Sequence, residues 1–138
     1  MKSKIRLEGM TLTVQNVSKS VEFYTKKLGF ECALNASPHF ALVQIKGTKG
    51  SSIGLLAWAE AKKDGAVKTS AKQKRGIHVE LSTDNLDKLY KELVKKGVKF
   101  HVAPHDEPWE RSATAFDPDG YSVETAQGRR GKNETKKK

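Results

Sequence analysis

Apolar residues alternate with small polar ones along residues 9–14, in the segment Gly-Met-Thr-Leu-Thr-Val. A period of two is typical of a β-strand with one buried face. Val21, Tyr24 and Leu28 then recur at helical spacing, and Gly29 ends the run. Three further apolar runs predict strands, at residues 30–34, 40–46 and 52–58. The first half therefore predicts the order β-α-β-β-β.

The second half repeats this pattern. Residues 77–82 alternate again, and a helical run whose apolar positions include Leu86, Leu89 and Leu93 ends at Gly97. Ser18 in the first half and Asp84 in the second are the expected N-caps of the two helices. Three short strands are predicted after the second helix, at residues 99–103, 111–116 and 121–125. The chain is therefore an internal repeat of β-α-β-β-β with an offset of about 69 residues.

The repeat offset matches positions between the halves. A shift of 69 places Gly9 on His78, and a shift of 70 places Gly54 on Glu124. In each strand these residues lie on the face opposite the apolar one, because successive side chains alternate between faces. If the two sheets curl around a shared cleft, all four positions point inward. His78 and Glu124 are the candidate catalytic pair among them.

These patterns predict an α+β fold, in which two tandem βαβββ modules form a cleft-shaped mixed β-sheet with helices outside. We expect one domain over residues 1–126, with modules at about 5–59 and 75–126. Between them lies a polar, lysine-rich link at 60–74. Residues 127–138 lack apolar side chains and are predicted to be a disordered basic tail.

The net charge of +10 is divided evenly between the tail and the body. The tail has six basic residues and one acidic residue, so each part carries +5. A basic tail and link make a nucleic-acid-associated protein one alternative, although no aromatic residues are interleaved with the charges. An aid to solubility is the plainer interpretation of the tail.

The compartment is predicted from cysteine content and hydropathy. Cys32 is the single cysteine, so no internal disulfide can form. No apolar run approaches the roughly 20 residues needed to cross a bilayer, and none follows the basic N-terminus as in a signal peptide. We therefore expect a cytoplasmic protein without a membrane partner.

Two groups of motifs fall at corresponding places in the two modules. The first is Val-Ser-Lys-Ser-Val-Glu-Phe-Tyr at 17–24 followed by Leu-Gly-Phe-Glu at 28–31. The second is Pro108-Trp109 with Arg111, leading into Phe-Asp-Pro-Asp-Gly at 116–120. With them the chain resembles the vicinal oxygen chelate superfamily, which includes glyoxalase I, bleomycin resistance proteins and extradiol dioxygenases. The resemblance covers about residues 5–126 and implies a homodimer.

The resemblance also implies metal ligands at the four inward positions. Gly9 and Gly54 cannot ligate through a side chain, so His78 and Glu124 are the only family ligands present. The expected cofactor is therefore none or one divalent metal, Zn, Ni, Mn or Fe. Glu80, on the same strand face as His78, is the best local candidate for a third ligand. His39, His101 or a partner subunit are the alternatives.

Three further residues are candidate ligand-binding groups. Arg111 has a planar guanidinium suited to carboxylate or phosphate, and it is expected at the cleft rim. Its alternative is a surface ion pair with Glu110 or Asp106. Trp58 and Leu56 are expected to wall the pocket, although Trp58 could instead pack under the link.

The favoured function is a glyoxalase-like protein that binds a small anionic or carbonyl-bearing metabolite between the modules. His78 and Glu124 would then act as a polar anchor or as a general base. A metal-dependent lyase or dioxygenase with a non-standard ligand set is the main alternative, so enzymatic activity is left open. The basic body disfavours capture of a cationic drug. The incomplete metal site disfavours a fosfomycin-type resistance activity.

Overall fold

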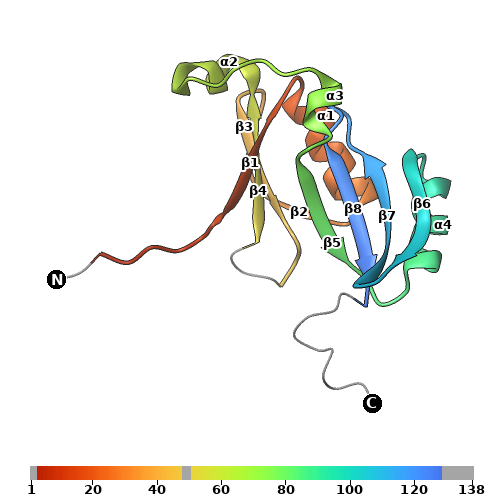
Figure 1. Cartoon of the computed structure of the whole chain (residues 1–138). Helices are drawn as coiled ribbons and strands as arrows, with labels where there is room; N and C mark the ends of the chain where they lie inside the picture. The colour runs from red at the N-terminus through yellow and green to blue at the C-terminus, as the bar shows by residue number, and fades with distance from the viewer. Residues whose placement is uncertain (1–2, 48–50, 129–138) are drawn as a thin grey trace. The chain divides into compact units, whose positions relative to one another are not determined.

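The computed structural model describes residues 3–47 and 51–128. Along the chain, the boundary between its two compact units falls between Lys68 and Thr69. Each unit contains one four-stranded mixed sheet with helices, so the chain is α+β as predicted (Figure 1).

The first unit contains the first βαβββ module. Its elements are β1 (Gly9–Val14), α1 (Val17–Glu22), the π-helical turn η1 (Phe23–Lys27), β2 (Glu31–Ala36), β3 (Phe40–Gln44), β4 (Ser52–Ala57), α2 (Trp58–Ala61) and the 3₁₀ turn η2 (Lys62–Asp64). The strand order is β1-β4-β3-β2, with β1 parallel to β4 and the other pairs antiparallel. Tyr24, Val43 and Leu55 are fully buried and form the centre of its core.

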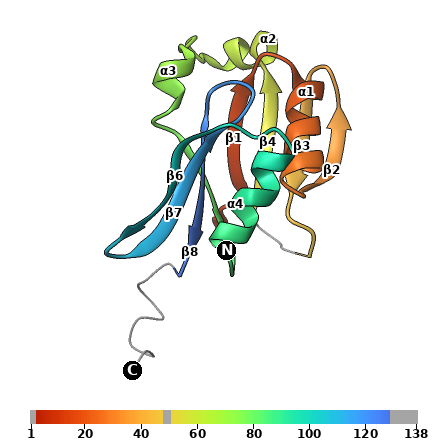
Figure 2. The ribbon, with the colours of Figure 1, turned by 90° about the vertical axis from the view of Figure 1, so that its right-hand side faces the viewer.

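The second unit contains the second module. Its elements are α3 (Ala71–Lys74), β5 (His78–Ser82), α4 (Leu86–Lys95), β6 (Phe100–Glu107), β7 (Glu110–Phe116) and β8 (Ser122–Gln127). The strand order is β5-β8-β7-β6, with β5 parallel to β8. Helix α4 contacts β6, β7 and β8 and lies on one side of this sheet (Figure 2). Leu86 and Leu93 of α4 are buried, as are Ala113 and Val123 of the sheet.

The predicted repeat is exact in register. Gly9 pairs with Ser52 in the first sheet, and His78 pairs with Ser122 in the second. Two pairs further along, and so on the same face, Gly54 is opposite Thr11 and Glu124 is opposite Glu80. The two modules therefore place corresponding residues at corresponding points of each sheet.

The helix caps differ from the predicted ones. Asn16 Oδ1 accepts a hydrogen bond from the Lys19 N–H, and Asn85 Oδ1 accepts one from the Lys88 N–H. The prediction of Ser18 and Asp84 was wrong, because an asparagine oxygen at the position before each helix satisfies the free N–H groups of the first turn. The two caps are 69 residues apart, so they follow the repeat as well.

The basic link is more structured than its composition predicts. It includes the turns α2, η2 and α3, and Ser70 forms a reciprocal capping box with Gln73. Glu60 is bound by Lys63 at 3.0 Å and by His39 at 2.9 Å. Within the described residues, no helix is long and apolar enough to cross a membrane.

Candidate functional site

Three potential ligand side chains gather on neighbouring strands of the second sheet. Glu80 on β5 is directly opposite Glu124 on β8, and His78 lies two residues before Glu80 on the same strand face. His78 Nδ1 is 3.5 Å from Glu124 Oε1. One ligand atom from each of these three residues lies within 4.8 Å of the others. The predicted pair and the predicted third residue therefore form one cluster.

The alternation of β8 explains how Glu124 reaches this position. Val123 and Thr125, its neighbours in sequence, are buried on the opposite face of the strand. Glu124 therefore projects from the face that carries His78. Its side chain is only 16% exposed, whereas that of His78 is 43% exposed. Glu124 forms the floor of the cluster and His78 its open side.

Glu110 is a fourth member that the sequence did not assign to the site. It begins β7 and is 5% exposed. Thr114 lies four residues later and pairs with Glu124, so Glu110 is on the Glu124 face. The alternation of β7 indicates this face for Glu110, whereas the sequence prediction names Glu110 only as a partner of Arg111.

The carboxylates of this cluster act on one another. Burial, followed by the negative charges of Glu80 and Glu110, raises the pKa of Glu124 above its ordinary value of 4.5. Hydrogen bonds with Glu80 and Glu110 raise the pKa further. A hydrogen bond between two carboxyl groups needs a proton on one of them. The cluster thus favours holding a positive charge, either a proton or a cation.

The donor set suits a divalent metal. One imidazole nitrogen and two carboxylate oxygens are ligands used for Zn²⁺, Mn²⁺, Fe²⁺ and Ni²⁺. Three protein ligands also leave positions open for an oxygen of a bound molecule. The mutual repulsion of Glu80 and Glu124 would be relieved by such an ion, so the residues present fit the group.

The corresponding positions of the first sheet are closed to side chains. Gly9 has a φ of +152°, and a Cβ there would overlap the Ser52 carbonyl oxygen. A Cβ on Gly54 would lie 2.7 Å from Thr11 Oγ1 and 3.1 Å from the Phe40 ring. Neighbouring atoms thus occupy the space that a ligating side chain would need at both glycines.

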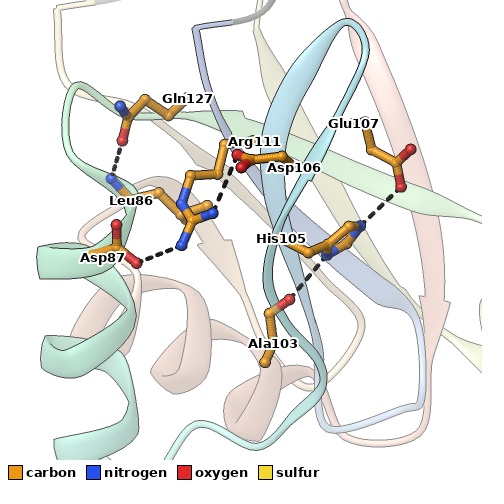
Figure 3. Close-up of polar contacts among 8 residues, drawn as sticks. All are labelled: Leu86, Asp87, Ala103, His105, Asp106, Glu107, Arg111 and Gln127. Carbon is orange, nitrogen blue, oxygen red and sulfur yellow. Dashed lines mark hydrogen bonds and ion pairs between the residues drawn. The ribbon is translucent and has the colours of Figure 1, made fainter.

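Arg111 lies away from the cluster. Along β7 it alternates in step with the buried Ala113 and Ala115, so its side chain lies on their face of the strand, opposite the face of Glu110. Its guanidinium binds Asp87 of α4 at 3.0 Å and Asp106 of β6 at 3.2 Å (Figure 3). The structure therefore does not bring Arg111 together with His78 and Glu124, and one of its partners is Asp106.

Trp58 and Leu56 belong to the first unit. Trp58 begins α2 rather than continuing the strand, and Lys68 Nζ lies 5.6 Å from its ring centre. Leu56 is half-buried on β4 and pairs with Phe40. Their role as a pocket wall stays a prediction.

A second group of side chains lies on the cluster face of the second unit. His101 stacks on Phe116 with ring centres 4.1 Å apart and an interplanar angle of 8°. The Arg75 guanidinium carbon is 4.8 Å from the Phe116 ring centre. His101 lies in β6, within the strand that the sequence predicts at residues 99–103. We refer to Arg75, His101 and Phe116 as the cationic platform.

His105, the other histidine of β6, is engaged locally. Nδ1 contacts the Ala103 carbonyl at 2.9 Å and Nε2 contacts Glu107 Oε2 at 2.9 Å (Figure 3). These hydrogen bonds raise the pKa of His105 above 6.5, the Ala103 carbonyl contributing most. It belongs to its own pair and not to the cluster.

Comparisons with known proteins agree with this architecture. The profile of the Glyoxalase/Bleomycin resistance protein/Dioxygenase superfamily matches residues 6–125. The chain is 28% identical over 123 residues to "Uncharacterized protein YraH" of Bacillus subtilis (strain 168), covering 87% of this chain and 96% of that protein.

Solved structures share the fold. A superfamily member from Sphaerobacter thermophilus DSM 20745 has a TM-score of 0.71 at 24% identity, covering 90% of this chain and 98% of the other. A glyoxalase/bleomycin resistance protein/dioxygenase from Nocardioides reaches 0.73 at 23% identity, covering 96% and 91%. TnmS3, an antibiotic binding protein from Streptomyces sp. CB03234, reaches 0.65 at 24%, covering 92% and 98%. The chain belongs to the Glyoxalase/Bleomycin resistance protein/Dioxygenase superfamily.

Proposed function

We propose that this chain binds a small anionic or carbonyl-bearing molecule through a divalent cation held by His78, Glu80 and Glu124. The observation that carries the proposal is the closeness of these three donors, whose ligand atoms lie within 4.8 Å of one another. They come from two paired strands, which fix their spacing through the backbone. A site on rigid strands needs little reorganisation to accept an ion.

A cation reconciles the acidic cluster with the proposed ligand. Glu80, Glu110 and Glu124 would repel an anion placed directly among them. A divalent ion offsets their charge and accepts a carbonyl or carboxylate oxygen at an open position. In this arrangement Glu110 is a positioning residue, because its hydrogen bond with Glu124 orients that carboxylate.

Enzymatic proton transfer at the same place is a second candidate. It is favoured by the raised pKa of Glu124, since a carboxyl group that titrates nearer neutrality is a better acid or base. This candidate applies to the cluster without a metal, because a divalent ion bound by Glu124 would lower the pKa of that carboxyl group. The chain's own part would be to accept or return the proton at a Glu124 or Glu110 oxygen, with His78 orienting the substrate.

The remaining predictions about partners and location have less support. The description of TnmS3 as an antibiotic binding protein supports small-molecule binding as a use of this fold. A homodimer and a cytoplasmic location stay predictions. The nucleic-acid alternative depends largely on residues 129–138, which lie outside the described residues.

Elemental analysis of the purified chain, before and after incubation with Zn²⁺, Ni²⁺, Mn²⁺ or anaerobic Fe²⁺, tests the proposal. We expect about one ion per chain in the wild type and none in the His78→Ala, Glu124→Ala double variant. Glu92→Gln, an exposed change on α4, is the matched control and should keep the ion. Absence of any ion in the wild type, or equal retention by the double variant, would contradict the proposal.

A further inference from the structure

We infer that the molecule bound at this site is a planar organic acid, whose separate acidic group pairs with Arg75 while its flat part lies against the exposed ring of His101. This inference rests on the proposed function, because it assigns the other end of the ligand to the cation. It names a binding group, Arg75, where the sequence had pointed to Arg111.

Paired strands connect the cationic platform to the cluster of His78, Glu80 and Glu124. His78 pairs with Ser122, and Ser122 pairs with Phe116. His101 then stacks on Phe116 from β6. The four residues form a row on one face, with one from each of the four strands. A ligand anchored at His78 can therefore extend along this row towards His101.

Arg75 is held in place at its backbone. Ser122 Oγ donates a hydrogen bond to the Arg75 carbonyl oxygen at 2.9 Å. The Arg75 N–H donates to the Lys72 carbonyl at 3.3 Å, at the end of α3. Ser122 is itself the neighbour of His78 in the sheet. The backbone of Arg75 is thus fixed beside the cluster, and its guanidinium lies over the Phe116 ring.

The two arginines of the second unit differ in what they bind. Arg111 is engaged by two carboxylates, Asp87 and Asp106. Arg75 is exposed, and among residues 3–47 and 51–128 no carboxylate forms an ion pair with it. A guanidinium stacked on an aromatic ring keeps its N–H donors free at the edge, where a carboxylate or phosphate binds in the same plane. Arg75 is therefore the available anion partner.

Charge on this face is divided between two ends. At one end, the Arg75 guanidinium lies over the Phe116 ring, on which His101 stacks. The carboxylates Glu80, Glu110 and Glu124 occupy the other end. A complementary ligand has oxygen donors for a cation at one end and a negative charge at the other. The exposed His101 ring, stacked on Phe116, offers a surface for a planar group.

A pair of hydroxamates separates the two ends in one experiment. Benzohydroxamate carries a metal-binding group on a flat ring, and 4-carboxybenzohydroxamate adds a carboxylate at the far side of the ring. Each is titrated calorimetrically into the Zn²⁺-loaded chain after removal of free metal. We expect the carboxylated probe to bind about 10-fold more tightly to the wild type, a ratio equivalent to about 1.4 kcal/mol.

Variants assign this preference to Arg75. Arg75→Gln should bind both probes equally, and Arg75→Lys should recover part of the preference because the positive charge is retained. Lys95→Gln removes an equal charge from the end of α4 and should leave the preference unchanged. The zinc content, measured in every variant, should stay at about one per chain.

The outcomes are distinct. Equal binding of both probes to the zinc-loaded wild type, or a preference that survives in Arg75→Gln, would overturn the inference and leave the proposed function standing. Failure of the wild type to retain zinc would overturn the proposed function, and the inference with it. Loss of the preference in Arg75→Gln alone, with zinc retained, would support both.

Discussion

The two sheets have one topology and one register, but their corresponding faces differ in chemistry. In the first sheet, Gly9 and Gly54 are packed against Ser52, Thr11 and Phe40, so that side chains have no room. In the second, His78 and Glu124 stand at the same positions and meet Glu80. The comparison teaches that a duplicated backbone can support a polar site in one copy and close packing in the other.

Removing the cluster should have the largest effect on binding. The His78→Ala, Glu124→Ala double variant is expected to lower the affinity for Zn²⁺ by at least about 100-fold, because two of three donors are lost. Calorimetric titration with Zn²⁺ measures this. A double variant that still binds Zn²⁺ like the wild type would show that the difference between the sheets is unrelated to metal.

Filling the first sheet should mainly destabilise the protein. Gly9→Ala places a Cβ against the Ser52 carbonyl at a φ that favours glycine, and we expect a loss of roughly 2–3 kcal/mol in the free energy of unfolding. His78→Ala, at the corresponding position, should change stability by less than about 0.5 kcal/mol. Urea denaturation monitored by circular dichroism compares the two. Equal stabilities would contradict the close packing described for the first sheet.

The cluster should also give stability an unusual pH dependence. Because the pKa of Glu124 is raised on folding, the folded state holds its proton more tightly than the unfolded state. In the metal-free protein, the contribution of Glu124 to stability is thus present below the ordinary value of 4.5 and is lost as pH rises through the raised pKa. Glu124→Gln should remove this decline. Denaturation curves at several pH values in the presence of a chelator measure the difference, and parallel profiles for wild type and variant would count against it.

The smallest effect is expected at Arg111. Its ion pairs with Asp87 and Asp106 are exposed to solvent, so Arg111→Gln should lower the melting temperature only slightly. Affinities for Zn²⁺ and for the carboxylated hydroxamate should not change, because Arg111 lies on the other face. A loss of probe binding in Arg111→Gln would instead return this residue to the role that the sequence predicted.

Most of the fold could be predicted from the periodicity of apolar residues along the chain. The offset that aligned Gly9 with His78 also describes the observed strand register, since alternation is a direct consequence of backbone geometry. The same rule also predicts the position of Arg111. Arg111 lies on the same strand face as Ala113 and Ala115, which are buried on the helix side of the sheet, and therefore on the face opposite Glu110.

Other parts of the site had no periodic signal. Arg75 precedes β5 and was indistinguishable from the other basic residues of the link. Only the folded chain places its guanidinium over Phe116, which is 41 residues away in sequence. The lack of space for a side chain at Gly54 likewise depends on Phe40 from a neighbouring strand. Contacts of this kind come from tertiary packing and leave no local pattern.

The central claim is that His78, Glu80 and Glu124 together hold one divalent cation. An electron paramagnetic resonance titration with Mn²⁺ tests it most directly, because the signal of free Mn²⁺ reports the unbound fraction. We predict about one bound ion per wild-type chain and strongly weakened binding in Glu80→Gln, with Glu92→Gln unchanged. Binding that is absent in the wild type, or equal in Glu80→Gln and the wild type, would contradict the account.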